Sequence, residues 1–153
     1  MATRHDTVTS VGLLILRVGV GAFMATHGWG KLQMIFDGKF DQFGDPLGLG
    51  SGLSLVLATG AEFFCALLVA IGLATRFAAA PVVFTMAIAA FVVHASDPWT
   101  MQPQGASKEP ALLFLIPMLA LVFTGPGRFS LDAILWPRLR QWWKARRKSP
   151  NPS

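Results

Sequence analysis

The feature that most constrains this chain is a set of four long apolar stretches that contain or adjoin ionisable residues. A helix needs about 20 predominantly apolar residues to cross a bilayer. The stretches predict spans at about 11–31, 53–75, 77–94 and 109–124. Only 14% of the residues are charged, whereas soluble domains carry about 25%. The sequence therefore predicts an all-α polytopic membrane protein with a four-transmembrane-helix bundle, rather than a soluble domain with one large core.

The C-terminal part differs in composition from the apolar stretches. Gly125-Pro126-Gly127 predicts the end of the fourth span. Beyond it, tryptophans are mixed with cations, which is typical of an amphipathic helix at the bilayer interface. Pro137 is expected to limit the length of this helix. We therefore expect a membrane domain at 1–133, followed at 134–153 by a basic interfacial helix and a disordered tail.

Basic residues predict the orientation, because cytoplasmic loops carry an excess of lysine and arginine. An even number of spans places both termini on one side. That side would hold Arg4, Arg76, Arg128 and the six basic residues of the tail, and the other side Lys31, Lys39 and Lys108. We expect a multi-pass protein of the cell (inner or plasma) membrane with both termini in the cytoplasm. The basic tail is typical of a membrane surface rather than a nucleic-acid site.

Ionisable groups inside spans are costly and usually face a bundle interior, a partner or a pathway. In the first span, polar and small residues recur at helical spacing from Arg17 to Lys31, and Glu62 lies near the middle of the second span. We expect these faces to turn toward other helices. One polar chamber, open to the outer face, would then be formed by six residues: His27, Lys31, Glu62, His94, Asp97 and Glu109. Arg17 would lie nearer the cytoplasmic side, paired with Asp132 or a helix C-terminus.

We assign proton exchange, and catalysis if the protein is an enzyme, to His27 and Glu62. The candidate binding residues are Arg17, Lys31, His94, Asp97 and Glu109, with Arg17 or Lys31 offsetting negative charge on a ligand. Structural alternatives stay open for these residues. Arg17 and Lys31 could instead be paired or snorkelling residues. His94 and Asp97 could pair at a helix end, and Glu109 could compensate a helix dipole.

No cofactor motif is evident, and a metal site is not predicted because the Glu-x-x-His signature of carboxylate-bridged bundles is missing. His27 and His94 would both lie in the outer half, which is compatible with bis-histidine haem ligation, but a packed or pH-responsive pair is the simpler interpretation. Cys65 is the single cysteine, so an intramolecular disulfide and a dithiol are excluded. A packing role is favoured for it.

Three segments resemble the DoxX family of membrane proteins: Leu14–Phe23 with the following His27-Gly28 and Gly30-Lys31, Gly60-Ala61-Glu62 leading to Gly72–Arg76, and Gly125–Asp132. The resemblance implies a small four-helix membrane protein. Gly125, Gly127, Arg128 and Asp132 are its structural motif residues. Relatives include quinone-reducing subunits of thiosulfate oxidation, and proteins assembled with superoxide dismutase and a sulfurtransferase. Some related proteins use cysteines, and the single cysteine here departs from that pattern.

Three functions remain open. The first is a redox-associated subunit, whose chamber would bind a quinone headgroup or a small sulfur oxyanion and whose electrons would come from a protein partner. The second is a non-enzymatic scaffold, whose basic tail would recruit soluble redox proteins. The third is a small-molecule transporter, which would need a homo-oligomer to enclose a pathway. A quinone is the candidate cofactor, and whether the protein is an enzyme is left open.

Overall fold

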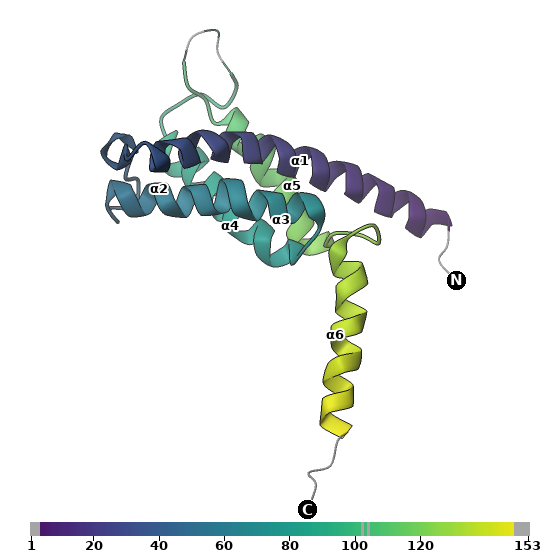
Figure 1. Ribbon diagram of the computed structural model, residues 1–153. Helices are drawn as coiled ribbons and strands as arrows, with labels where there is room; N and C mark the ends of the chain where they lie inside the picture. Colours follow the sequence, from purple (N-terminus) through teal and green to yellow (C-terminus); the bar gives the residue numbers. More distant parts are fainter. Residues whose placement is uncertain (1–3, 102, 104, 149–153) are drawn as a thin grey trace, which may run out of the picture.

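The computed structural model describes residues 4–101, 103 and 105–148, and its elements over these residues are all helical. Figure 1 shows their arrangement. The elements are α1 (Arg4–Phe36), η1 (Phe40–Gln42), α2 (Ser51–Thr59), η2 (Gly60–Cys65), α3 (Ala66–Ile71), α4 (Thr75–Ile88), η3 (Ala89–Val93), α5 (Glu109–Thr124) and α6 (Leu131–Lys148). The short η1 is a 3₁₀ helix, whereas η2 and η3 are π-helical segments that continue the helices beside them.

Within the described residues, three helical runs are long and apolar enough to cross a membrane: 6–36, 51–71 and 75–93. The fourth apolar helix, α5, has 16 residues and would extend about 24 Å, somewhat less than the roughly 30 Å hydrocarbon core. The predicted all-helical membrane bundle is thus confirmed, although α1 is longer than expected because helix continues beyond both ends of its apolar stretch. The chain is a multi-pass membrane protein.

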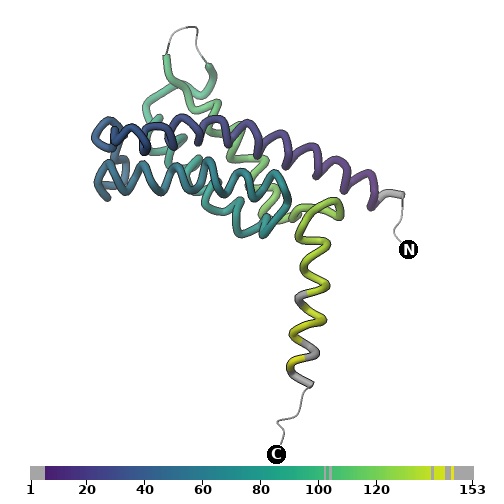
Figure 2. The backbone as a smooth tube through the Cα atoms, viewed as in Figure 1, coloured from purple at the N-terminus to yellow at the C-terminus, as the bar shows by residue number. Residues whose placement is uncertain are grey.

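The four apolar runs pack antiparallel. Figure 2 shows the chain reversing at each connection, so that the start of α1, the turn between α3 and α4, and the start of α6 lie near one end. Small and flexible side chains fill the core between the helices. Helices in a membrane associate through close packing rather than through a hydrophobic driving force, and such side chains let their backbones approach closely. The fully buried members include Met24, Ala66, Val69, Ala79, Val82, Met118 and Leu121.

The last helix, α6, points away from the bundle (Figure 1). Ser130 caps its start, because its Oγ accepts a hydrogen bond from the Ala133 N–H at 3.2 Å. The expectation that Pro137 limits this helix was wrong, since the helix runs through it to Lys148. A proline at 137 removes one hydrogen bond to the Ala133 carbonyl, and because Ala133 is exposed that carbonyl can be solvated instead. The predicted boundary after residue 133 falls inside α6, and the predicted disorder of residues 149–153 lies outside the described residues.

Candidate functional site

The site is built where α1 packs against η2 without intervening side chains. A Cβ added to Gly28 would lie 2.5 Å from the Glu62 carbonyl carbon and 2.5 Å from the Phe63 nitrogen. Seven residues earlier, a Cβ on Gly21 would lie 2.7 Å from the Ala66 oxygen. The two glycines therefore share one helix face and bring the α1 backbone into contact with the second span. Lys31 follows Gly28 by three residues on the same face.

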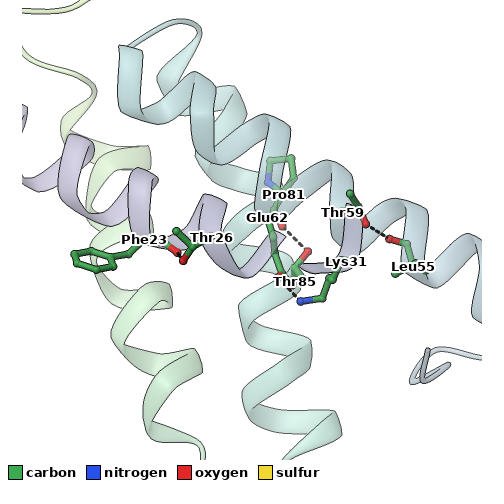
Figure 3. A network of polar contacts seen from close by, with 8 residues as sticks. All are labelled: Phe23, Thr26, Lys31, Leu55, Thr59, Glu62, Pro81 and Thr85. Carbon is green, nitrogen blue, oxygen red and sulfur yellow. Dashed lines mark hydrogen bonds and ion pairs between the residues drawn. The ribbon is translucent and has the colours of Figure 1, made fainter. Parts of the chain in front are cut away.

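Lys31 and Glu62 form an ion pair between the Nζ and Oε2 atoms, as Figure 3 shows. The Glu62 side chain is 5% exposed and the Lys31 side chain 23%. An unpaired carboxylate at this depth would carry a large desolvation penalty, so the lysine offsets the charge that makes Glu62 costly inside a span. The sequence placed both residues in one polar chamber but did not pair them with each other.

Both π-helical segments line the same cavity as this ion pair. Glu62 belongs to η2, and Ala89 and Val93 belong to η3 on the third span. Single-turn π-helical bulges inside α-helices are rare and are frequent at functional sites. Here η2 lies inside the second span and η3 forms the last turn of the third, and both contribute residues to the cavity. The coincidence marks this cavity as the candidate site.

The cavity has a volume of about 390 Å³. Apart from Lys31 and Glu62, its polar side chains are Ser54 and Thr85, and both hydroxyls donate hydrogen bonds elsewhere, to Asp45 at 2.9 Å and to the Pro81 carbonyl at 3.0 Å. Figure 3 shows Thr85 beside the ion pair and directed toward Pro81. The ion pair therefore supplies the charge in an otherwise apolar cavity. The apolar lining includes Phe43, Pro46, Leu47, Leu49, Leu57, Phe84 and Ile88.

The loop before α2 closes one side of the cavity. Asp45 accepts hydrogen bonds from the N–H groups of Leu49 (2.9 Å) and Gly50 (2.7 Å) and from the Ser54 hydroxyl (2.9 Å). The hydrogen bond from Gly50, followed by the other donors, lowers the pKa of Asp45 below its ordinary value. This arrangement holds the loop so that Pro46, Leu47 and Leu49 face the cavity.

His27 lies outside this cavity lining. Its side chain is exposed on the flank of α1, and its ring packs edge-on against Phe114 of α5, with 5.3 Å between the ring centroids. Neighbouring residues are roughly 100° apart around a helix, so His27 sits at the edge of the stripe whose centre is Gly28. The polar face expected from Arg17 to Lys31, which included His27, was wider than the face that α1 buries against η2.

The other members of the expected chamber form two separate local contacts. His94 Nδ1 lies 2.7 Å from Asp97 Oδ2, and Glu109 accepts a hydrogen bond from the Met101 N–H at 2.6 Å. None of these three residues lines the cavity. Sequence reasoning missed Lys108, which is 7% exposed and donates to the carbonyls of Ala95 (2.8 Å) and Asp97 (2.7 Å). Nothing in the sequence around Lys108 distinguished it from a solvated loop lysine.

Arg17 links α1 to neighbouring segments at the end of the bundle opposite the cavity. It is 2% exposed and donates to the carbonyls of Ala70 (2.8 Å) and Phe129. Ala70 belongs to the last turn of α3, so the predicted pairing with a helix C-terminus is confirmed. Asp132 instead accepts hydrogen bonds from the N–H groups of Ala74 (2.7 Å) and Thr75 (2.9 Å), and thereby caps α4.

The remaining motif residues shape the connection from α5 to α6. Gly125 and Gly127 both have φ of +75°, a backbone conformation that favours glycine. A Cβ on Gly125 would lie 3.1 Å from Arg76 Nε, and one on Gly127 would lie 3.3 Å from Leu13 Cβ. The Arg128 N–H donates to the Ser10 hydroxyl at 3.4 Å, while Arg128 itself is exposed. These residues hold the structure together at a distance from the cavity.

The π-helical segments and the loop residues of the cavity were not found from the sequence. Apart from Glu62, Gly60–Cys65 and Ala89–Val93 have the composition of ordinary apolar helix. A change in the hydrogen-bond pattern of a helix leaves no compositional signal. Asp45 carried a weak signal, since an Asp-Pro pair before glycines predicts a turn. Among the described residues, no group of three or more histidine, cysteine, aspartate or glutamate side chains is placed to hold a metal ion.

The family model described as DoxX matches residues 12–95 of this chain, which is more than half of its length and includes Lys31, Glu62 and both π-helical segments. No curated protein matches the chain. No solved structure matches it either.

Proposed function

This chain belongs to the DoxX family, and we propose that it is a redox-associated membrane subunit whose cavity binds the headgroup of a quinone dissolved in the bilayer. The observation that carries the proposal is the Lys31–Glu62 ion pair in the wall of an otherwise apolar cavity of about 390 Å³. Ligand pockets have volumes of about 300–1,000 Å³ and combine apolar walls with a few placed polar groups. A cavity at the lower end of this range suits a single ring.

The position of the cavity supports a ligand that arrives from lipid. Leu57 and Phe84 line it, yet 54% of Leu57 and 63% of Phe84 is exposed on the membrane-facing surface of the bundle. The loop before α2, which Asp45 holds in place, covers another side of the cavity. A quinone could therefore place its ring beside the ion pair while its isoprenoid tail stays among acyl chains. A small sulfur oxyanion would find apolar walls and one cation, which is a poorer match.

The ion pair offers the two proton-handling groups that quinone chemistry needs. The Lys31 ammonium can donate a hydrogen bond to a ring carbonyl and stabilise negative charge that develops there. The Glu62 carboxylate can accept a proton from a quinol hydroxyl, or return one when the quinone is reduced. Reduction of a quinone takes two electrons and two protons. The electrons would come from a partner redox protein, and the two protons would be taken up from water and passed on by Glu62 one after the other. We propose the plasma membrane as the location, with both termini in the cytoplasm.

A binding measurement with a soluble quinone analogue tests this function. The protein would be placed in phospholipid nanodiscs and titrated with decylubiquinone, with Lys31→Met as the test variant, because Lys31 is the donor to the ring carbonyl, and Asp37→Asn as the control. Asp37 pairs with Lys39 on the exposed loop and lies outside the cavity lining. Loss of a hydrogen bond that involves a charged group costs about 1.5–3 kcal/mol, so Lys31→Met should weaken binding at least tenfold while Asp37→Asn binds normally.

A second variant separates loss of the site from loss of folding. Ala89→Leu adds volume to the cavity wall without removing the ion pair, and should block binding while leaving the helical circular dichroism unchanged. Equal decylubiquinone binding by the wild-type protein and both variants would refute the proposal. So would the absence of binding to a well-folded wild-type protein.

A basic scaffold is the second candidate function, and one observation favours it. Helix α6 carries six basic residues and projects from the bundle, where a soluble protein could reach it. The two functions are compatible, because a partner that docks at α6 could also supply electrons. Deleting residues 138–153 should abolish recovery of such a partner and leave decylubiquinone binding intact.

A further inference from the structure

Helix α6 has a surface that the quinone proposal does not use. Over Leu131–Lys148 the sequence contains six basic residues and one acidic residue, Asp132. The Asp132 carboxylate accepts hydrogen bonds from the N–H groups of Ala74 and Thr75, so it is turned toward the bundle. The part of α6 that projects beyond the bundle therefore carries positive charge without a compensating carboxylate of its own.

The same helix also exposes apolar and aromatic side chains. Leu131, Leu135 and Trp142 share one helix face by their spacing, and their exposed fractions are 38%, 38% and 48%. Arg146 lies over the Trp142 ring with 3.9 Å to the centroid, and Arg140 lies over the Trp136 ring at 5.8 Å. Tryptophans beside cations are typical of the layer between hydrocarbon and water. If α6 lay wholly in water, this apolar area would be unfavourably hydrated.

Contacts at its base place α6 at the level where the spans end. The Asp132 N–H donates to the Gly72 carbonyl at 2.9 Å, and the Phe129 carbonyl accepts a hydrogen bond from Arg17. Gly72 lies between the end of α3 and the start of α4. The first turn of α6 is therefore attached to the turn that joins two spans, and the helix leaves sideways from that end of the bundle (Figures 1 and 2).

We propose that α6 is a binding surface for anionic phospholipid headgroups, in which Arg138, Arg140 and Arg146 contact lipid phosphates. Charge complementarity and the position at the end of the spans select a lipid surface over an acidic protein. Each basic residue near an anionic leaflet strengthens attraction about fivefold. The surface would thus select anionic lipids around this end of the bundle, independently of what the cavity binds.

Quenching of tryptophan fluorescence by brominated lipids tests the proposal with the full-length chain. In a Trp29→Phe, Trp99→Phe background, the remaining tryptophans are Trp136, Trp142 and Trp143, all on α6. In phosphatidylcholine nanodiscs that contain phosphatidylglycerol, bromine would be placed on either lipid at the same mole fraction. Brominated phosphatidylglycerol should quench at least twice as strongly as brominated phosphatidylcholine, and added salt should reduce the difference because it screens exposed charges.

The matched variants are Arg138→Gln/Arg140→Gln/Arg146→Gln as the test and Lys39→Gln as the control at the other end of the bundle. The triple variant should quench equally with both lipids, whereas Lys39→Gln should behave as the wild-type protein does. Equal quenching by the two lipids in the wild-type protein would overturn the proposal. Weak quenching by either lipid would also overturn it, and would place α6 in water, where an acidic protein could bind it.

Discussion

The ion pair between Lys31 and Glu62 predicts a strong energetic coupling between the first two spans. Lys31→Met removes the cation and leaves Glu62, which is 4% exposed, without its partner. Glu62→Gln removes the buried negative charge instead, and leaves a lysine whose side chain is 23% exposed and long enough to extend toward the nearby end of α1. The two single substitutions should therefore lower the free energy of unfolding by unequal amounts, although each breaks the same contact.

Removing one partner of a buried ion pair costs about 3–5 kcal/mol, and the exposure of Lys31 places Lys31→Met near the lower end, at roughly 3 kcal/mol. Glu62→Gln should cost about 1 kcal/mol, because it strands no buried charge. The double variant should cost about 2 kcal/mol, because it loses the charge-assisted hydrogen bond but leaves no charge buried without a partner. The resulting coupling energy is about 2 kcal/mol in favour of the pair.

The assay is an unfolding titration in mixed micelles, followed by circular dichroism and by labelling of Cys65 with a thiol-reactive dye. Cys65 is the only cysteine and lies in η2 with Glu62, so its labelling reports opening of the segment that carries the ion pair. If the losses caused by the two single substitutions simply add in the double variant, within about 0.5 kcal/mol, the reasoning is refuted and the contact contributes only packing.

Two further predictions concern the residues that position the ion pair. Gly28→Ala should destabilise the bundle by about 1–3 kcal/mol through overpacking and should weaken decylubiquinone binding. Gly30→Ala, on the same helix but with open space around its Cβ, should leave stability and binding nearly unchanged. Similar melting temperatures for the two variants would contradict the close packing of α1 on η2. The lowered pKa of Asp45 means that its hydrogen bonds stabilise the loop fully above the ordinary aspartate pKa and lose this effect as pH falls through the lowered value. Amide hydrogen exchange at Leu49 and Gly50, corrected for its intrinsic pH dependence, should therefore show that protection of these amides falls at acidic pH. If an Asp45→Asn variant keeps the wild-type pH dependence, another group controls the loop.

Most of the fold could be predicted because the bilayer restricts what a sequence of this kind can form. Backbone groups in hydrocarbon must be paired within the chain, so apolar stretches of span length have few alternatives to helix. The predicted fourth span and α5 both cover residues 109–124, and the other three runs differ mainly at their ends. Helix ends depend on local capping and on loop geometry, such as the attachment of Asp132 to the α4 start, which the apolar pattern does not contain.

The site was only partly predictable, because helical spacing identifies a face but not the width of its contact. Glu62 could be singled out since a carboxylate in the middle of a span needs a partner, and Lys31 was among the few cations within reach. His27 was grouped with them because it lies on the same half of α1, yet only the strip through Gly21 and Gly28 comes within backbone contact of the second span. A helix face half the circumference wide thus contains residues that contact different neighbours, and here His27 contacts α5 through Phe114.

Ordinary helical spacing explains why residues separated along two spans share one cavity. The lining positions Ser54, Ala58 and Glu62 lie four residues apart on the second span, and Thr85, Ala89 and Val93 lie four apart on the third. The π-helical segments are local distortions at this stripe, since η2 contains Glu62 and η3 forms the last turn of its span. Such distortions persist only where surrounding contacts hold them, and the backbone contact of Gly28 with Glu62 is one such contact. Gly28, which has no side chain to touch a ligand, therefore controls the geometry of the cavity as directly as the charged residues do.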